Sequence, residues 1–477
     1  MKSTSPFILF LGSLLSLSLL EANAIPLSPG HTGIITLPLK RIPTRQDIHP
    51  QLLFQQHINR SHRRLARMTG HEEPSAEELL GRLGSREAHL TGRGSPRVGH
   101  AGAVLGNQGN PGKTSRAAAN AGFSPVDLKA LLADTVTPAD KPTAANSLAL
   151  DDINNDVGYL ATVQMGTPPR DFQILMDSGS ADLWVGAEGC QSAQGADCGN
   201  HTFLGTQSST SFVDTQKPFQ VTYGKGAVAG NIIKENIAIA GLKLTAHTFG
   251  VALQETDDFT ASQFDGLMGL AKSTLSEQKA LTPVEALAKA GSIKDAIVSY
   301  KISRLADQKN DGTITFGGLD PSKFDQTTLV ALPNVNTQGF WEAAMDAVTV
   351  DGKDLGLKGR TAVLDTGTTL IIAPPADAQA IHKAIPGSKS NGNGFVIPCT
   401  TNASIALSFG GKSFAIDPRD ITFAPVDPND PTGDCSSGIV PGQFGGPQQL
   451  LVGDVFLKNA YFSTNVGKDT IQLAKLT

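Results

Sequence analysis

Short runs of Val, Ile, Thr and Phe recur along most of this chain, and Gly, Pro, Asn or Asp interrupts each of them. Runs of this length and composition predict β-strands joined by turns, with few and short helices. The 50 glycines among 477 residues strengthen that prediction, and an apolar content of 40% is enough for a large core and more than one domain. The pattern therefore predicts an all-β protein.

The first apolar run has a different character. Lys2 precedes a 14-residue apolar stretch from Phe7 to Leu20, and Ala22-Asn23-Ala24 forms a small-x-small cleavage site. The stretch is too short to span a membrane, and the pattern is typical of a secretory signal peptide. We expect residues 1–24 to be that signal, with an uncleaved signal anchor as the alternative.

The region that follows carries weaker patterns. Residues 34–41 form a strand-like run that turns basic at its end, and Pro38 would be tolerated in such a strand only at a sheet edge. Residues 51–68 are compatible with a strongly basic helix. From 69 to 149 there is little apolar periodicity, which indicates a flexible, protease-sensitive tether with one short helix at 125–132.

Charge divides the chain into two parts. Residues 25–150 carry 15 Lys and Arg against 9 Asp and Glu, whereas residues 151–477 carry 23 against 34. A basic leader should dock on an acidic body at neutral pH and loosen when acid protonates the carboxylates. The alternative is a disordered tail without a regulatory role.

Two similar segments stand out within the body. Residues 174–180 and 362–368 each place an aspartate, Asp177 or Asp365, after three apolar residues and before a turn with glycine. Either aspartate alone would usually cap a turn. Two matched copies suggest buried carboxylates that meet, share a proton and serve as base and acid toward water, which is chemistry suited to peptide hydrolysis.

A second repeated element supports a duplicated lobe. Residues 267–270 and 451–454 each contain an apolar pair followed by glycine, and Gly269 and Gly453 lie 92 and 88 positions after Asp177 and Asp365. Recurrence in the same order at nearly equal spacing indicates two related halves that face each other.

With these motifs, residues from about 151 to 477 resemble a pepsin-like aspartic endopeptidase. The resemblance also includes the segments 166–172, 221–226, 315–320 and 453–457. It implies a bilobal all-β fold with a central cleft, an N-lobe at about 148–335 and a C-lobe at about 336–477. Residues 25–147 would be an inhibitory propeptide that ends somewhere between 141 and 151.

The residues beside the two aspartates have expected supporting roles. Ser180 and Thr368 should each donate a hydrogen bond to the carboxylate three positions earlier. The resemblance implies that Ser178 and Thr366 cross-link the two loops beneath the site, while Gly179 and Gly367 let the backbone approach closely. Ordinary Ser/Thr turns are the alternative.

The resemblance further implies a hairpin flap over the cleft. Tyr223 and Gly224 would lie in it, and the tyrosine would bond to Trp184. Lys225 departs from the small or acidic residue more usual there. Its charge should disfavour basic side chains just before the cleaved bond, unless it is a solvated tip residue.

Four cysteines lie in the body, and four allow three disulfide pairings. Proximity favours Cys190 with Cys198 and Cys399 with Cys435. Metal binding is less favoured because there is no CxxC and no nearby histidine pair, so no metal or cofactor is expected. Glycosylation sequons occur at Asn59, Asn200 and Asn402.

These patterns predict a secreted, monomeric acid endopeptidase that cleaves polypeptides and is inhibited by its own propeptide. Neither a nucleic-acid partner nor a membrane anchor is expected. The alternatives are a vacuolar protease of the same mechanism and a non-catalytic pepsin-like binding or inhibitor protein. A serine hydrolase or zinc peptidase is disfavoured because Gly-x-Ser-x-Gly and His-Glu-x-x-His are both missing from the sequence.

Overall fold

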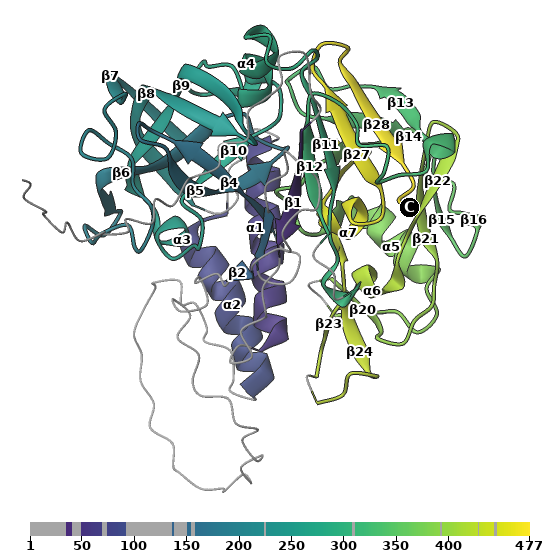
Figure 1. Ribbon diagram of the computed structural model, residues 1–477. Coiled ribbons are helices and arrows are strands. Elements are labelled where there is room, and N and C mark those ends of the chain that lie inside the picture. Colours follow the sequence, from purple (N-terminus) through teal and green to yellow (C-terminus); the bar gives the residue numbers. More distant parts are fainter. Residues whose placement is uncertain are drawn as a thin grey trace, which may run out of the picture.

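The computed structural model of the chain describes residues 35–40, 49–68, 74–91, 136–137, 150–153, 158–223, 226–307, 311–391, 394–427, 429–442 and 446–477. The predicted signal peptide, the predicted helix at 125–132, Gly224 and Lys225 lie outside these residues. Within them the chain is mostly β, as predicted. Figure 1 shows two β bodies, one built mainly from teal and the other from green and yellow segments, with α1 between them.

The largest sheet joins the two bodies. Its path is β13-β28-β27-β11-β12-β1-β3-β4-β5-β10-β6-β9-β8-β7, and β2 pairs with β3. The bounds are β1 Ile35–Lys40, β2 Val136–Thr137, β3 Leu150–Ile153, β4 Gly158–Met165, β5 Arg170–Asp177, β6 Leu183–Ser192, β7 Val213–Thr222, β8 Ala227–Ile239, β9 Leu242–Glu255, β10 Gly266–Gly269, β11 Ile297–Lys301, β12 Thr313–Phe316, β13 Val330–Pro333, β27 Tyr461–Asn465 and β28 Thr470–Ala474.

Three smaller sheets form most of the second body, with paths β14-β17-β26-β18-β25, β16-β15-β21-β22 and β19-β20-β24-β23. Their bounds are β14 Glu342–Met345, β15 Ala347–Val350, β16 Lys353–Asp354, β17 Arg360–Leu364, β18 Ile371–Ala373, β19 Lys389–Ser390, β20 Phe395–Pro398, β21 Ile405–Phe409, β22 Lys412–Ile416, β23 Thr422–Pro425, β24 Asp434–Ser437, β25 Ile439–Pro441 and β26 Gln449–Val452. We call the body built on β4–β10 the N-terminal lobe and the body built on β14–β26 the C-terminal lobe.

Helices are few among the described residues, and most are short. They are α1 Pro50–Met68, α2 Ala76–Thr91, α3 Asp257–Thr260, α4 Pro283–Lys289, α5 Pro375–Lys383, α6 Pro418–Ile421 and α7 Asp454–Leu457, with 3₁₀ turns at Ser273–Leu275, Leu305–Asp307 and Gln326–Thr328. In this part of the chain, no helix has both the length and the apolar character needed to cross a membrane.

The leader strand is present, but the prediction that Pro38 would restrict it to a sheet edge is wrong. Strand β1 lies inside the large sheet, antiparallel to β12 and parallel to β3. Pro38 is the last residue in register with β12, and Leu39 is the first in register with β3. The proline, which cannot donate a hydrogen bond, therefore sits where pairing passes from one neighbour to the other.

The leader also forms a helical hairpin. Helix α1 matches the predicted basic helix and buries Phe54, Ile58 and Leu65. Helix α2 was not predicted, and the prediction of a flexible tether is wrong for residues 76–91. Its leucines Leu79 and Leu83 are buried, and that tertiary packing outweighs the weak helical pattern.

Side chains of α1 bind α2 directly. The Arg86 guanidinium of α2 donates to Gln51 and Gln55 and stacks 5.8 Å from the centre of the Phe54 ring. Asn59 Nδ2 donates to the carbonyl of Leu79. Because Asn59 is buried and its amide is engaged, a glycan at this sequon is incompatible with the docked hairpin, whereas Asn200 and Asn402 are exposed.

Both disulfides form as proximity suggested, Cys190 with Cys198 and Cys399 with Cys435. The first closes a loop at the end of β6 in the N-terminal lobe. The second ties β24 to the residue that follows β20 in the C-terminal lobe. Each lobe therefore carries its own crosslink.

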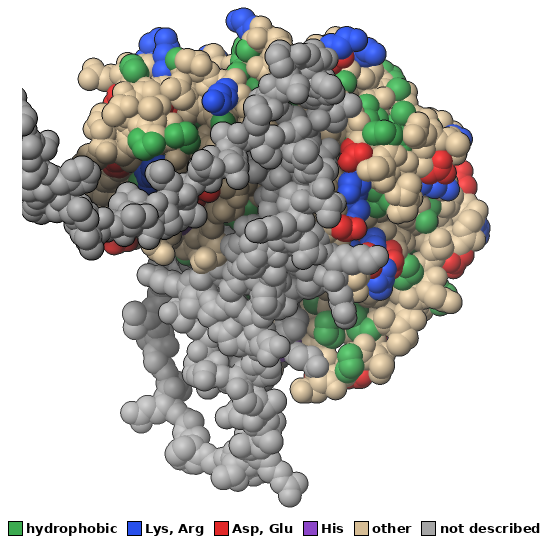
Figure 2. Space-filling view, viewed as in Figure 1, with side chains coloured by type: hydrophobic (Ala, Val, Ile, Leu, Met, Phe, Trp, Pro, Cys, Tyr) green, Lys and Arg blue, Asp and Glu red, His purple; other side chains and the backbone are tan. Residues whose placement is uncertain are grey.

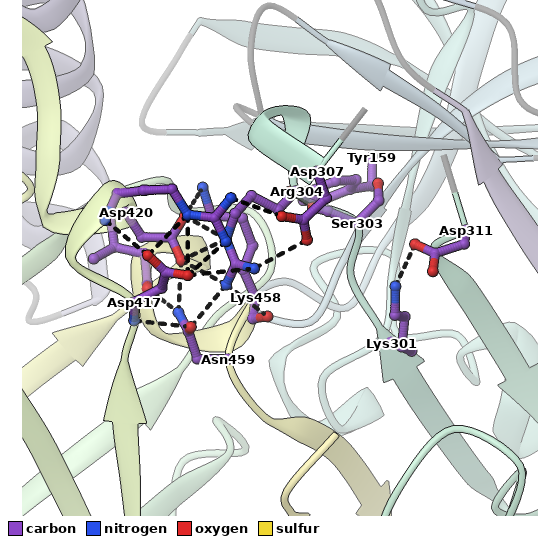
Figure 3. A network of polar contacts seen from close by, with 12 residues as sticks. Tyr159, Lys301, Ser303, Arg304, Asp307, Asp311, Asp417, Asp420, Lys458 and Asn459 are labelled. Carbon is purple, nitrogen blue, oxygen red and sulfur yellow. Dashed lines mark hydrogen bonds and ion pairs between the residues drawn. The ribbon is translucent and has the colours of Figure 1, made fainter. Parts of the chain in front are cut away.

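A polar network anchors the large sheet to the C-terminal lobe (Figure 3). Arg304, which follows β11, donates from Nε and Nη2 to both oxygens of Asp420 in α6 at 2.8–3.1 Å. Lys458 lies 2.9 Å from the same carboxylate. Burial alone would raise the pKa of Asp420, but Lys458 and Arg304 hold it below its ordinary value, so this anchor keeps its charge in moderate acid.

The surface of the C-terminal lobe carries both signs of charge. In Figure 2, Lys and Arg side chains lie interspersed with Asp and Glu on the described part of the visible face.

Glu255, at the end of β9, is an exception among the buried acids. It is 2% exposed, lies beside the Cys190–Cys198 disulfide, and neither carboxyl oxygen has a hydrogen-bond partner among the described residues. Burial, with a smaller contribution from Asp265, raises the pKa of Glu255 to about 8. The folded chain therefore favours the neutral acid, and this residue costs stability as pH rises from 4.5 toward 8.

We predict that Glu255→Gln stabilises the chain at neutral pH. The gain in the free energy of unfolding over the wild type should be larger at pH 7.5 than at pH 5 by on the order of 3 kcal/mol. The amide carries no charge at either pH, so the cost of burying it is the same at both and cancels in this comparison. Denaturant unfolding at the two pH values measures it. As a control, Glu235→Gln changes a buried glutamate that accepts hydrogen bonds from Ser211 and the Asn236 amide, and it should show no such gain. An equal effect of Glu255→Gln at both pH values would contradict the prediction.

Candidate active site

The two repeated aspartates are delivered by equivalent strands of the two lobes. Asp177 ends β5 and Asp365 directly follows β17, and both are fully buried. Strand β5 runs parallel to β10, and β17 runs parallel to β26. Leu270 N donates to the Asp177 carbonyl at 2.7 Å and Asp365 N donates to the Val452 carbonyl at 3.0 Å. The second repeated motif therefore forms the strand that supports each aspartate.

Close backbone packing explains the glycines of that second motif. A Cβ at Gly269 would lie 2.5 Å from the backbone of Ala181, and one at Gly453 would overlap the backbone of Thr368. These neighbours belong to the turns that follow the two aspartates. Glycine is thus required because each supporting strand passes directly against a turn.

Matching donors surround the two carboxylates. Ser180 Oγ donates to Asp177 Oδ2 at 2.6 Å, and Thr368 Oγ1 donates to Asp365 Oδ2 at the same distance. The amides of Gly179 and Gly367 each donate to the Oδ1 atom of their aspartate at 2.9 Å. Each carboxylate therefore has one hydroxyl and one amide donor, which favour its ionised form.

Two hydroxyl residues bind the two lobes together beneath the carboxylates. Ser178 N donates to Thr366 Oγ1 at 3.0 Å, and Thr366 N donates to Ser178 Oγ at 2.9 Å. Each hydroxyl then donates across the interface, Ser178 Oγ to the Leu364 carbonyl and Thr366 Oγ1 to the Met176 carbonyl. This reciprocal set fixes the separation of the two turns.

A leader residue that the sequence did not single out lies on both carboxylates. Arg64, on α1, donates from Nη2 to Asp365 Oδ1 at 2.7 Å and to Asp177 Oδ1, and its Nε lies 2.5 Å from Asp365 Oδ2. One guanidinium nitrogen thus contacts both aspartates, which places them face to face. The signal was a basic helix, but nothing in the sequence separates Arg64 from Arg60 or Arg63.

The electrostatics of this cluster are strongly coupled. Burial opposes the charge of Arg64, but Asp177 and Asp365 outweigh burial and raise its pKa above the ordinary arginine value. Burial also raises the pKa of Asp365, and the neighbouring Asp177 adds to this, while Arg64, Thr368 and Gly367 oppose the rise. Without the arginine, such a pair would retain a proton between its carboxyls and could hold a water molecule as acid and base.

The flap residues that the structure describes lie beside this site. Trp184 Nε1 donates to the Tyr223 hydroxyl at 2.9 Å, which is the bond expected between them. Both side chains are buried and pack with Phe259. Gly224 and Lys225 lie outside the described residues, so the tip of the hairpin and the lysine hypothesis stay predictions.

A cavity of about 470 Å³ remains between the leader and the N-terminal lobe. Its lining includes Arg64, Ser180, Tyr223, Glu277 and Phe340. It therefore extends from Arg64 and Ser180, which bond to the paired aspartates, to the flap tyrosine, and it is large enough for amino-acid side chains.

Comparison with known proteins identifies relatives. A family model described as eukaryotic aspartyl protease matches residues 158–476. A probable aspartic-type endopeptidase CTSD of Trichophyton verrucosum is 36% identical over 337 residues, which are 70% of this chain and 64% of that protein. Rhizopuspepsin of Rhizopus chinensis is 31% identical over 334 residues, 69% of this chain and 81% of that protein. Vacuolar protease A of Arthroderma otae is 29% identical over 348 residues, 71% and 83% of the two chains.

The match to the Trichophyton protein spans less than two thirds of that protein's length. The family model covers well over half of this chain, and the matched residues include both aspartates, the flap and the supporting strands. The chain therefore belongs to the eukaryotic aspartyl protease family.

Proposed function

We propose that the chain is an aspartic endopeptidase, made as a zymogen and active at acid pH, in which Asp177 and Asp365 activate water. The observation that carries the proposal is the pair of buried, equivalently hydrogen-bonded carboxylates around one leader guanidinium. The family membership and the names of the relatives support the same reaction.

In the proposed reaction, one carboxylate takes a proton from water, and the water oxygen attacks the peptide carbonyl carbon. The other carboxyl, which is protonated, donates its proton to the carbonyl oxygen, so a tetrahedral diol forms. When the diol collapses, the C–N bond breaks, the amine takes the first carboxyl's proton, and a diol hydroxyl returns a proton to the second. Tyr223 covers the cleft during these steps.

The leader, predicted to span residues 25–147, is proposed to inhibit the enzyme in the same chain. Strand β1 occupies the large sheet, α1 places Arg64 on the aspartates, and α2 braces α1. A substrate carbonyl and its attacking water need the position that the guanidinium fills. The docked leader is therefore incompatible with catalysis.

Acid should release this leader by protonating two sites: the Asp177–Asp365 pair, which we call the dyad, and His62. His62 Nε2 faces the Pro441 carbonyl at 3.4 Å, while Nδ1 lies 3.1 Å from Arg82 Nη1. An arginine N–H can only donate, so Nδ1 must accept and the docked imidazole must be neutral. Glu78, which pairs with Arg82, is the acidic group near the ring.

The direction of the pH effect follows from this contact. Burial, and then Arg82, lower the pKa of docked His62 below 6.5. As pH falls below 6.5, a released leader gains a proton at His62 that the docked leader cannot accept, so docking weakens. Protonation of the pair of aspartates also weakens the Arg64 ion pairs.

The predicted signal peptide favours secretion as the location. The likeness to vacuolar protease A keeps the vacuole as the alternative. A non-catalytic binding protein is disfavoured because both aspartates retain their hydroxyl and amide donors.

The function is tested by acidifying the full chain and assaying a denatured protein substrate with and without a statine-type inhibitor. We expect inhibitor-sensitive cleavage with an acid optimum. Asp177→Asn and Asp365→Asn should each lower kcat/KM by at least about 100-fold, because the dyad loses a proton carrier. Activity confined to neutral pH, or unchanged in either variant, would overturn the proposal.

We predict that Arg64→Met makes the leader release at a higher pH. The variant leaves two buried carboxylates under an apolar side chain, which should destabilise docking by about 3 kcal/mol. The measured quantity is the pH midpoint of leader loss on gels. Arg60→Met, which removes a charge from the same helix and leaves both dyad ion pairs in place, should move the midpoint far less. Equal shifts in the two variants would exclude a specific role for Arg64.

His62→Gln should have the opposite effect. The amide can still donate toward Pro441 and accept from Arg82 but cannot be protonated, so the midpoint should fall by roughly half a pH unit. His247→Gln, a change in a buried histidine on β9, is the control and should leave the midpoint in place. A midpoint unchanged by His62→Gln would remove this histidine from the release mechanism.

A further inference from the structure

Helix α3 forms part of the N-terminal lobe beside the flap. Phe259 packs edge-on against Trp184, with ring centres 5.1 Å apart, and against Tyr223 at 5.7 Å. Thr256, just before α3, exchanges hydrogen bonds with Ala227, the first residue of β8 after the hairpin turn, both at 3.0 Å. The position of α3 relative to the flap is therefore fixed by packing and by backbone bonds.

The first turn of α3 carries two acids, Asp257 and Asp258, neither of which the proposed reaction uses. Figure 1 shows α3 on the side of its lobe next to the leader helices. There the Asp258 carboxylate lies 3.6 Å from Arg63 Nη1, and both side chains keep just over a fifth of their surface exposed. This ion pair links the leader to the lobe at a second point.

The position of Arg63 locates that acid relative to the dyad. Arg63 directly precedes Arg64, whose guanidinium lies between the two aspartates. Successive helical side chains diverge by about 100°, so Arg64 reaches the dyad while Arg63 reaches the lobe wall. Asp258 therefore pairs with Arg63, which is one residue away from the arginine that contacts Asp177 and Asp365.

We propose that Asp258 is a specificity-determining residue that selects Lys or Arg close to the scissile bond of polypeptide substrates. This inference rests on the proposed peptidase function. Once the leader leaves, the carboxylate that paired with Arg63 has lost that cation. A substrate ammonium or guanidinium restores the pair, whereas an acidic side chain at the same place is repelled.

Lys225 is predicted to act in the opposite sense, by repelling basic side chains before the cleaved bond. Asp258 lies on α3, whereas Lys225 is predicted from the sequence to lie at the tip of the hairpin. A cleavage profile separates the two contributions. Each charge can be neutralised in its own variant, and the residue preference of that variant can be read at every substrate position.

The test is a cleavage profile of the acid-activated enzyme on a peptide library, read by mass spectrometry. The wild type should favour Lys or Arg at one position within about three residues of the cut. Asp258→Asn should lower kcat/KM for those peptides by about two- to fivefold, which is the range of a partly exposed ion pair. It should leave kcat/KM for peptides with an apolar residue there unchanged.

Asp257→Asn is the matched control, since it removes the neighbouring acid of the same turn, and it should keep the basic preference. Asp258→Lys should turn the preference toward Glu and Asp at the same position. If Asp258→Asn cleaves with the wild-type profile, Asp258 serves the leader alone and the inference is wrong. If no variant and no wild-type sample cleaves anything, the proposed function itself has failed.

Discussion

The structure depends on burying two carboxylates at one point. Two like charges in a site of low dielectric cannot both stay ionised without a compensating cation or proton. Each lobe contributes one aspartate at the end of a buried strand, and a glycine of the supporting strand lets the backbone pass against the aspartate turn. Ser178 and Thr366 then fix how closely the two turns approach.

The same constraint explains the leader. Arg64 supplies the cation that an ionised pair needs, and one nitrogen of its guanidinium donates to both carboxylates at once. Acid supplies the alternative, a proton. In the proposed zymogen and in the enzyme proposed to arise from it, a cation and a proton would be two ways to neutralise one site, and docking of the leader favours the neutral form of His62 as well. The Asp420 anchor and the neutral form of Glu255 suit the folded chain to the acidic range.

Much of this fold could be predicted from sequence because the strands repeat a strong local pattern. The Asp177 and Asp365 segments, the later glycines and the Trp184–Tyr223 pair each carry a motif of several residues. Helix α2 could not be predicted in this way, because its leucines are buried only by contact with α1. The prediction for Pro38 was wrong for a related reason, since its place inside the sheet depends on β12 and β3, two strands distant in sequence.

The choice of Arg64 among the basic residues of α1 depends on how that helix is rotated against the lobes, which no local pattern encodes. The pairing of Arg63 with Asp258, nearly 200 positions away, is hidden for the same reason. Charge totals correctly suggested that leader and body attract each other, but they do not indicate which side chains meet.

At the pair of aspartates, protons are proposed to replace Arg64. Hydrogen–deuterium exchange of the α1 amides in the wild-type chain, corrected for the intrinsic pH dependence of exchange, tests it most directly. We expect protection of residues 50–68 to fall steeply as pH drops below 6.5, because release of the leader takes up protons at His62 and at the pair of aspartates. Protection that stays constant from pH 7 to pH 4, or that rises in acid, would contradict it.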